Sequence, residues 1–147
     1  MCLNVLPLKD VLPMDALAEI RKRLKKYPDV QVRDDGDRIE VIPSKPDGFL
    51  VSFYKHGDEF TVGYGGWHET FSEPEKALTC FAFGLSSDCR LLVTCRGRFE
   101  YRWVVERRID GLWTKIDETG LLVLIPFWRP KSIKILSNDM LTAVEQL

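Results

Sequence analysis

The sequence predicts an α+β protein in which a long, curled antiparallel sheet wraps around one buried helix, residues 73–85. Dipeptides suited to tight turns, such as Asp35-Gly36 and Asp110-Gly111, join segments that alternate apolar and polar residues. Strands joined by such turns are antiparallel. Between residues 77 and 85 only Thr79 is polar, and a helix that is apolar nearly all round is a buried one. No alternation of strand and helix suggests a parallel sheet, so these elements predict the α+β class.

The first third of the chain is predicted to form an amphipathic helix, packed outside the sheet, followed by a hairpin. Apolar residues at spacings of three and four place the helix at residues 13–27. Strands at residues 30–33 and 38–42 follow, and a two-residue turn at Asp35-Gly36 would place Val32 opposite Ile39. The apolar face of the helix consists of Leu17, Ile20, Leu24 and Tyr27.

A second hairpin, residues 49–55 and 60–64, is predicted around a turn at Gly57-Asp58. Gly66-Trp67-His68 is interpreted as a loop that leads to the buried helix. Ser72-Glu-Pro-Glu75 is a capping box with proline in the first turn, which predicts where that helix begins.

The last third is predicted to consist mainly of strands. Residues 91–96 and 99–107 form a hairpin around Gly97-Arg98, and the turn at Asp110-Gly111 then aligns two further strands. That turn would pair Val105 with Ile116, Glu106 with Lys115 and Arg108 with Trp113, which are favourable cross-strand pairs. Three further elements are expected: a central strand at 121–127, a last strand at 131–136 and a short helix at 138–147.

Composition limits the class of protein. A length of 147 residues predicts one domain, 1–147, and the net charge of -1 argues against a dedicated polyanion binder. No apolar segment is long enough to cross a bilayer, and the first residues lack the pattern of a signal peptide. The cysteines have no metal-binding spacing and are read as reduced thiols of a cytoplasmic protein: Cys2, Cys80, Cys89 and Cys95. No cofactor, metal or membrane partner is therefore expected.

The sequence contains no catalytic motif. Cys80 lies within the predicted buried helix, where a thiol is inert. Glu69, Glu73 and Glu75 lie near His68 in sequence, so a small-ligand-binding enzyme that uses this histidine is one alternative function. The capping box and the helix N-terminus nevertheless account for two of these carboxylates.

Nucleic-acid binding is a second alternative. Residues 90–108 contain six arginines and two glutamates, with Tyr101 and Trp103 between them, and single strands are bound by stacking and phosphate contacts. Strand alternation, however, puts Tyr101 and Trp103 on the face of Phe99 and Val105, which is expected to be the core. Nucleic acid is therefore predicted to be a poor partner.

The predicted function is that of a small binding protein without catalytic activity, which interacts with a protein partner. Bacterial immunity proteins, which block a toxin, are one such class, suggested by size and architecture alone. The predicted site is a strip without side chains on the outer face of the second hairpin, because interior glycines in a strand often mark a close approach by a ligand or backbone. Its residues are Tyr54, Gly63, Gly65, Trp67 and His68, with Trp128 and Arg129 as candidates from the end of the chain. An alternative is that the first helix covers this strip and Trp67 packs in the core.

Overall fold

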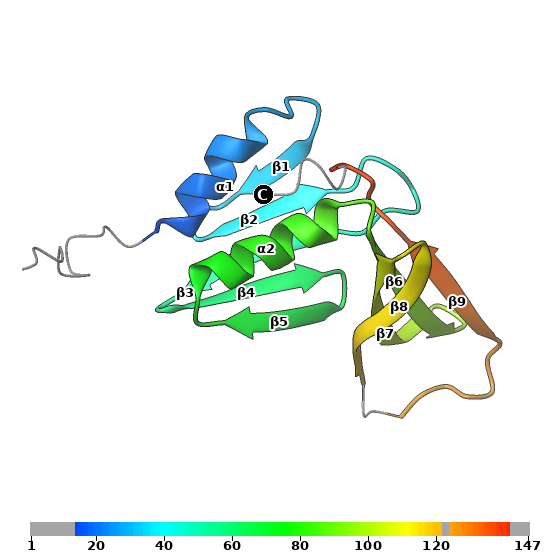
Figure 1. The fold of residues 1–147 in the computed structure, drawn as a ribbon. Helices are drawn as coiled ribbons and strands as arrows, with labels where there is room; N and C mark the ends of the chain where they lie inside the picture. The colour runs from blue at the N-terminus through cyan, green and yellow to red at the C-terminus, as the bar shows by residue number, and fades with distance from the viewer. Residues whose placement is uncertain (1–13, 122–123, 142–147) are drawn as a thin grey trace, which may run out of the picture.

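The chain forms two antiparallel sheets and two helices (Figure 1). The structure is a computed structural model that describes residues 14–121 and 124–141. The α+β class is confirmed. The strands are divided between two open sheets, so the expected enclosure of one helix by a single curled sheet is not confirmed.

The first sheet is a five-stranded meander, in which each strand pairs with the next one in the chain. Both helices pack on the same face of this sheet, and neither of them covers the opposite face (Figure 1). Successive side chains of a strand point to opposite faces of the sheet. Those that point toward the helices are apolar and buried, which explains why the helices pack on this face. The elements are α1 (Ala16–Leu24), β1 (Gln31–Asp34), β2 (Arg38–Ile42), β3 (Val51–His56), β4 (Glu59–Tyr64), β5 (Trp67–Phe71) and α2 (Pro74–Leu85).

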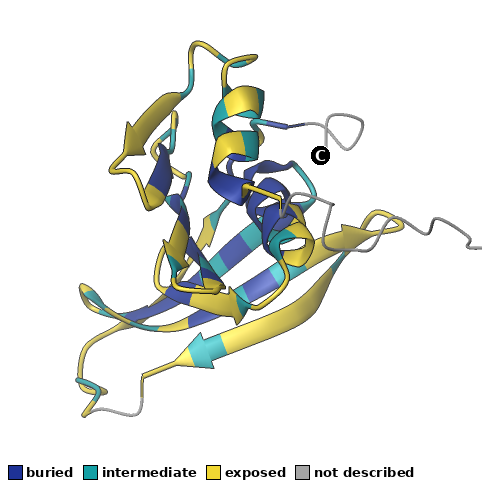
Figure 2. Cartoon of the chain, turned by 90° about the vertical axis from the view of Figure 1, so that its left-hand side faces the viewer, coloured by how far each residue is buried: buried dark blue, intermediate teal, exposed yellow. Residues whose placement is uncertain are grey.

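Helix α2 lies across the first sheet and buries most of its apolar residues there (Figure 2). Phe81 packs edge-on against Phe53 of β3, with ring centroids 5.8 Å apart. Thr79 on the other side of the helix is exposed, so α2 is covered on one side rather than all round. The helix begins one residue later than expected: its N-cap is Glu73, which makes no capping hydrogen bond, so the predicted capping box does not form.

The second sheet has the strand order β8-β7-β6-β9 and packs beside the end of α2. The ring of Trp103 lies so close to Gly66 that a Cβ on this glycine would overlap it. Asn138 adds a polar link, because it accepts a hydrogen bond from the Phe49 amide and donates one to the Gly84 carbonyl, both at 3.0 Å. The strands are β6 (Cys89–Arg96), β7 (Phe99–Ile109), β8 (Leu112–Gly120) and β9 (Lys131–Leu136).

The register of the first hairpin differs from the prediction. Val32 pairs with Val41 and Asp34 with Ile39, so the loop is two residues longer than a two-residue turn would make it. The guanidinium of Arg21 explains the difference. It donates hydrogen bonds to the Asp34 carboxylate and to the Gly36 carbonyl, which holds the longer loop against α1.

Other turns match the prediction closely. The turns at Gly57-Asp58 and Gly97-Arg98, and the strand at 131–136, are confirmed. Beside the Asp110-Gly111 turn, Glu106 pairs with Lys115 and Arg108 with Trp113, as predicted. Val105 lies opposite Asp117 rather than Ile116, because the ladder is irregular between Val105 and Glu106.

Two predicted elements near the C-terminus are wrong within the described residues. Leu121 and residues 124–127 belong to no strand, and Leu124 and Phe127 are exposed. The place beside β6 that a central strand would take is filled by β9. Residues 138–140 are not helical, and 142–147 lie outside the described part of the chain.

Candidate binding site

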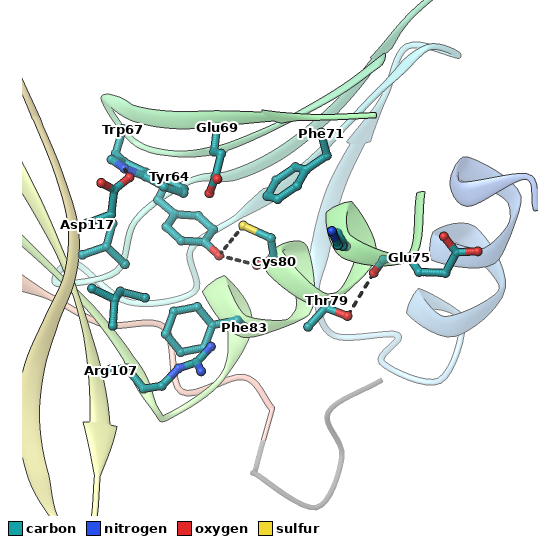
Figure 3. A pocket seen from close by; sticks show the side chains of 13 residues that line it. Tyr64, Trp67, Glu69, Phe71, Glu75, Thr79, Cys80, Phe83, Arg107 and Asp117 are labelled. Carbon is teal, nitrogen blue, oxygen red and sulfur yellow. Dashed lines mark hydrogen bonds between the residues drawn. The ribbon is translucent and has the colours of Figure 1, made fainter. Parts of the chain in front are cut away.

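A cavity of about 600 Å³ lies in the corner where the two sheets meet (Figure 3). Strand β5 forms one wall, α2 the floor, and β7 and β8 the opposite wall. Six of the thirteen lining residues are aromatic or aliphatic, and five are charged. The lining residues are Tyr64, Trp67, Glu69, Phe71, Glu75, Lys76, Thr79, Cys80, Phe83, Val105, Arg107, Ile116 and Asp117.

The alternation of β5 supplies the first wall. Residues 67–71 form an edge strand, where the sequence predicted a loop at 66–68. Among the described strands, it pairs with β4 alone. Trp67, Glu69 and Phe71 all project to the side of the sheet that faces α2. His68 and Thr70 project to the other side, because successive side chains of a strand alternate.

Trp67 connects the two sheets. Its indole N–H donates a hydrogen bond of 2.9 Å to the Asp117 carboxylate of β8, and its ring stacks on Tyr64 with centroids 4.7 Å apart. The irregular ladder beside Val105 places the consecutive residues Ile116 and Asp117 both on the cavity wall. A regular ladder would send neighbouring side chains to opposite faces.

The floor of the cavity contains a protonated thiol. Burial raises the pKa of Cys80 to about 12, and the Tyr64 hydroxyl, 3.2 Å from Sγ, only partly offsets this effect. The same hydroxyl donates to the Cys80 carbonyl. The Tyr64 ring packs so closely on α2 that a Cβ at Gly84 would overlap it, which explains a glycine inside the helix.

Two opposite charges face each other across the cavity. Glu69 raises the pKa of Cys80 and Arg107 lowers it, so both charges lie near the thiol. The Arg107 guanidinium lies 4.4 Å above the centroid of the Phe83 ring. Within the described residues, neither Glu69 nor Arg107 forms an ion pair, so both remain able to bind a polar ligand group.

The structure separates the residues of the predicted strip. Gly63, Tyr54 and His68 lie on the outer face of the first sheet, where Gly63 pairs with both Ser52 and His68. The first helix does not cover this strip, because α1 packs on the opposite face (Figure 1). Tyr54 is 44% exposed and stacks on His56.

The close approach at Gly63 comes from within the sheet: a Cβ there would lie 2.6 Å from the Ser52 hydroxyl. Gly65 has a positive φ of 55° and forms the turn between β4 and β5. Trp67 is only 3% exposed and points into the cavity, so it does not present its ring beside the glycines.

Trp128 and Arg129 lie in the loop between β8 and β9, where the Arg129 side chain packs on Gly97, and neither residue lines the cavity. The expectation that they join Trp67 is therefore wrong. Sequence reasoning missed most of the cavity wall, including Phe71, Arg107 and Asp117. The signal it overlooked is the alternation Trp-x-Glu-x-Phe over residues 67–71, which is typical of a strand.

No group of three or more His, Cys, Asp or Glu side chains within 14–121 and 124–141 could hold a metal ion. Cys80, Cys89 and Cys95 are free thiols. Neither α1 nor α2 has the length and apolar character that crossing a bilayer requires.

Comparisons with known proteins give no match: no protein family, no curated protein and no solved structure is significantly similar to this chain.

Proposed function

We propose that this chain is a non-catalytic protein-binding module, which holds an extended segment of a partner protein along the free edge of β5. An immunity protein that blocks a toxin is one member of this class, and a cytoplasmic site of action suits the free thiols. The observation that carries the proposal is a strand edge that no described strand pairs with, next to a cavity lined in part by aromatic residues.

A strand added to β5 would continue the first sheet by main-chain hydrogen bonds, a common mode of peptide recognition. Its inward side chains would lie about 5 Å from those of Trp67, Glu69 and Phe71 on the same face. They would therefore enter the cavity. Arginine is one of the residues that most often dominate binding energy at interfaces, and Arg107 lies on the wall opposite β5.

The positions of the reactive groups favour binding over catalysis. Cys80 is held protonated at neutral pH, because burial raises its pKa to about 12, and a protonated thiol is a poor nucleophile. His68 lies on the outer face of β5, whereas Glu69 and Glu75 line the cavity on the inner side. A histidine and its carboxylates on opposite faces of a strand do not form an acid–base pair.

The contacts of the arginines favour a protein partner over nucleic acid along β6 and β7. Arg90 is paired with Glu106, Arg102 with Glu118 and Arg108 with Asp88. Arg107 packs on Phe83. A phosphate backbone would have to compete with these contacts, which reduces its gain from binding.

A peptide library displayed on phage tests the proposal. We expect the chain to select peptides that bind the cavity, so that Thr79→Trp, which fills it from α2, weakens their binding at least tenfold. Ala18→Trp is the matched control, because Ala18 is also an exposed helical residue but lies on α1, away from the cavity. Failure to select any peptide, or equal binding to Thr79→Trp and to the control, would overturn the proposal.

A further inference from the structure

The outer end of the second sheet carries exposed apolar side chains in a group. Residues 96–99 and 124–131, called the tip, comprise the turn between β6 and β7 and part of the connection from β8 to β9. Leu124 is 99% exposed, Phe127 76% and Trp128 74%. Large apolar groups exposed together usually mark an interaction surface.

The two parts of the tip are held together by hydrogen bonds to backbone carbonyls. The Gly97 amide donates to the Pro130 carbonyl at 3.0 Å, and the Arg96 guanidinium donates to the Arg129 carbonyl at 3.3 Å. The rings of Phe127 and Trp128 lie edge to face with centroids 5.7 Å apart. The aromatic pair is thus carried on a loop that is fastened to the sheet.

Four cations belong to the same two segments, residues 96–99 and 124–131. Arg96, Arg98 and Arg129 line one shallow depression, and Lys131 begins the neighbouring strand β9. None of the four has a carboxylate partner among the described residues, in contrast to the paired arginines of β6 and β7. An excess of positive charge beside exposed leucine and aromatic side chains complements a surface that is negatively charged outside and apolar beneath.

We propose that the tip docks on an anionic lipid bilayer surface. Leu124, Phe127 and Trp128 would enter the boundary between headgroups and acyl chains, where aromatic rings with a polar edge are favoured. The four cations would then lie at the level of the anionic headgroups. This contact is independent of the β5 edge and requires no segment that crosses the membrane.

Lipid is favoured over the other partners by the kind of side chain at the tip. Single-stranded nucleic acid is bound by stacking on aromatic rings, and the almost fully exposed Leu124 offers no such surface. A second copy of the chain would bring the same cations together, and like charges across an interface are costly.

Sedimentation of the chain with lipid vesicles tests the proposal. We expect binding to vesicles that contain phosphatidylserine and phosphatidylcholine, and little binding to phosphatidylcholine alone. Arg98→Gln with Lys131→Gln should lower partitioning about thirtyfold, since each basic residue near an anionic surface contributes about 1 kcal/mol. Phe127→Ala with Trp128→Ala should lower it as well, because the apolar insertion is lost.

The matched control is Ile109→Ala with Leu112→Ala, which removes exposed apolar side chains from the turn between β7 and β8. This control should bind vesicles like the original chain. No binding to anionic vesicles would overturn the proposal, as would equal losses in the control. Binding to an oligothymidylate but not to vesicles, or a dimer that depends on Phe127 and Trp128, would also contradict it.

Discussion

The indole N–H of Trp67 and the carboxylate of Asp117, 50 residues apart in sequence, form a hydrogen bond that joins the two sheets beside the cavity. A hydrogen bond to a charged group contributes about 1.5–3 kcal/mol when it is shielded from water, and this one is only partly buried. We expect Asp117→Ala to lower the free energy of unfolding by about 1–2 kcal/mol. Urea denaturation measures this, and Asp58→Ala in the exposed turn between β3 and β4 is the control. Equal effects of the two substitutions would show that the bond contributes nothing.

The contact between α2 and the first sheet depends on Phe81, which is buried against Phe53. Truncation of a buried phenylalanine leaves a cavity, so Phe81→Ala should cost about 3–5 kcal/mol of stability. Chemical denaturation provides the measurement. A loss below about 1 kcal/mol would mean that the α2–sheet contact is loose.

Gly66 lies against the indole of Trp103, where a Cβ would overlap the ring. Gly66→Ala should therefore displace the second sheet and destabilise the protein by about 1–3 kcal/mol. Gly120→Ala is the matched control, because the nearest atom to its Cβ would be a carbonyl oxygen at an ordinary 3.4 Å. We expect this control to change the unfolding free energy by less than about 0.5 kcal/mol. Similar thermal unfolding curves for both variants would contradict the described packing.

Stability should fall at alkaline pH because of Cys80. Its pKa is raised from 9.0 to about 12 in the folded chain, chiefly by burial, so the folded state holds this proton more tightly than the unfolded state. The resulting stabilisation is complete below pH 9 and is lost as the pH rises toward 12. Denaturation of Cys80→Ala across this range should show a shallower loss than the original chain. If the free energy of unfolding falls equally steeply with pH in both proteins, the Cys80 thiol does not have the raised pKa.

The carboxyl group of Asp34 should have an unusually low pKa. The Arg21 guanidinium, followed by the Gly36 amide, lowers its pKa from 3.8 to about 2. Any stability from this contact is present above pH 3.8 and is lost as the pH falls toward 2. Titration by NMR should show the Asp34 midpoint near 2, and Arg21→Gln should move it back toward 3.8. The same midpoint in both proteins would rule out this ion pair.

The sequence predicted the tight hairpins well, because their turn residues act locally. Gly57-Asp58 and Gly97-Arg98 fall where the turns are, since the flanking alternation and the turn chemistry agree. The first hairpin was misaligned by two residues, because its loop is held by Arg21 from a different element. A contact between distant elements leaves no local pattern in the sequence.

The predicted strand at 121–127 was wrong for a different reason. Apolar character alone predicted a buried strand, yet Leu124 and Phe127 are exposed, because β9 already pairs with β6 at that position. The strand β5 was missed since only seven residues, 67–73, separate its turn from α2. The cavity was beyond sequence reasoning, as its walls come from both sheets and from a ladder irregularity beside Val105.

Amide hydrogen exchange tests most directly whether a partner segment binds along β5. With a selected peptide bound, the amides of residues 67–71 should exchange more slowly, because the free strand edge gains main-chain partners. Strand β1, the other edge of the same sheet, is the internal control and should be unchanged. Protection confined to β5 and the cavity wall is the predicted result. Protection on the outer face around Tyr54 and His68, with β5 unchanged, would contradict the account.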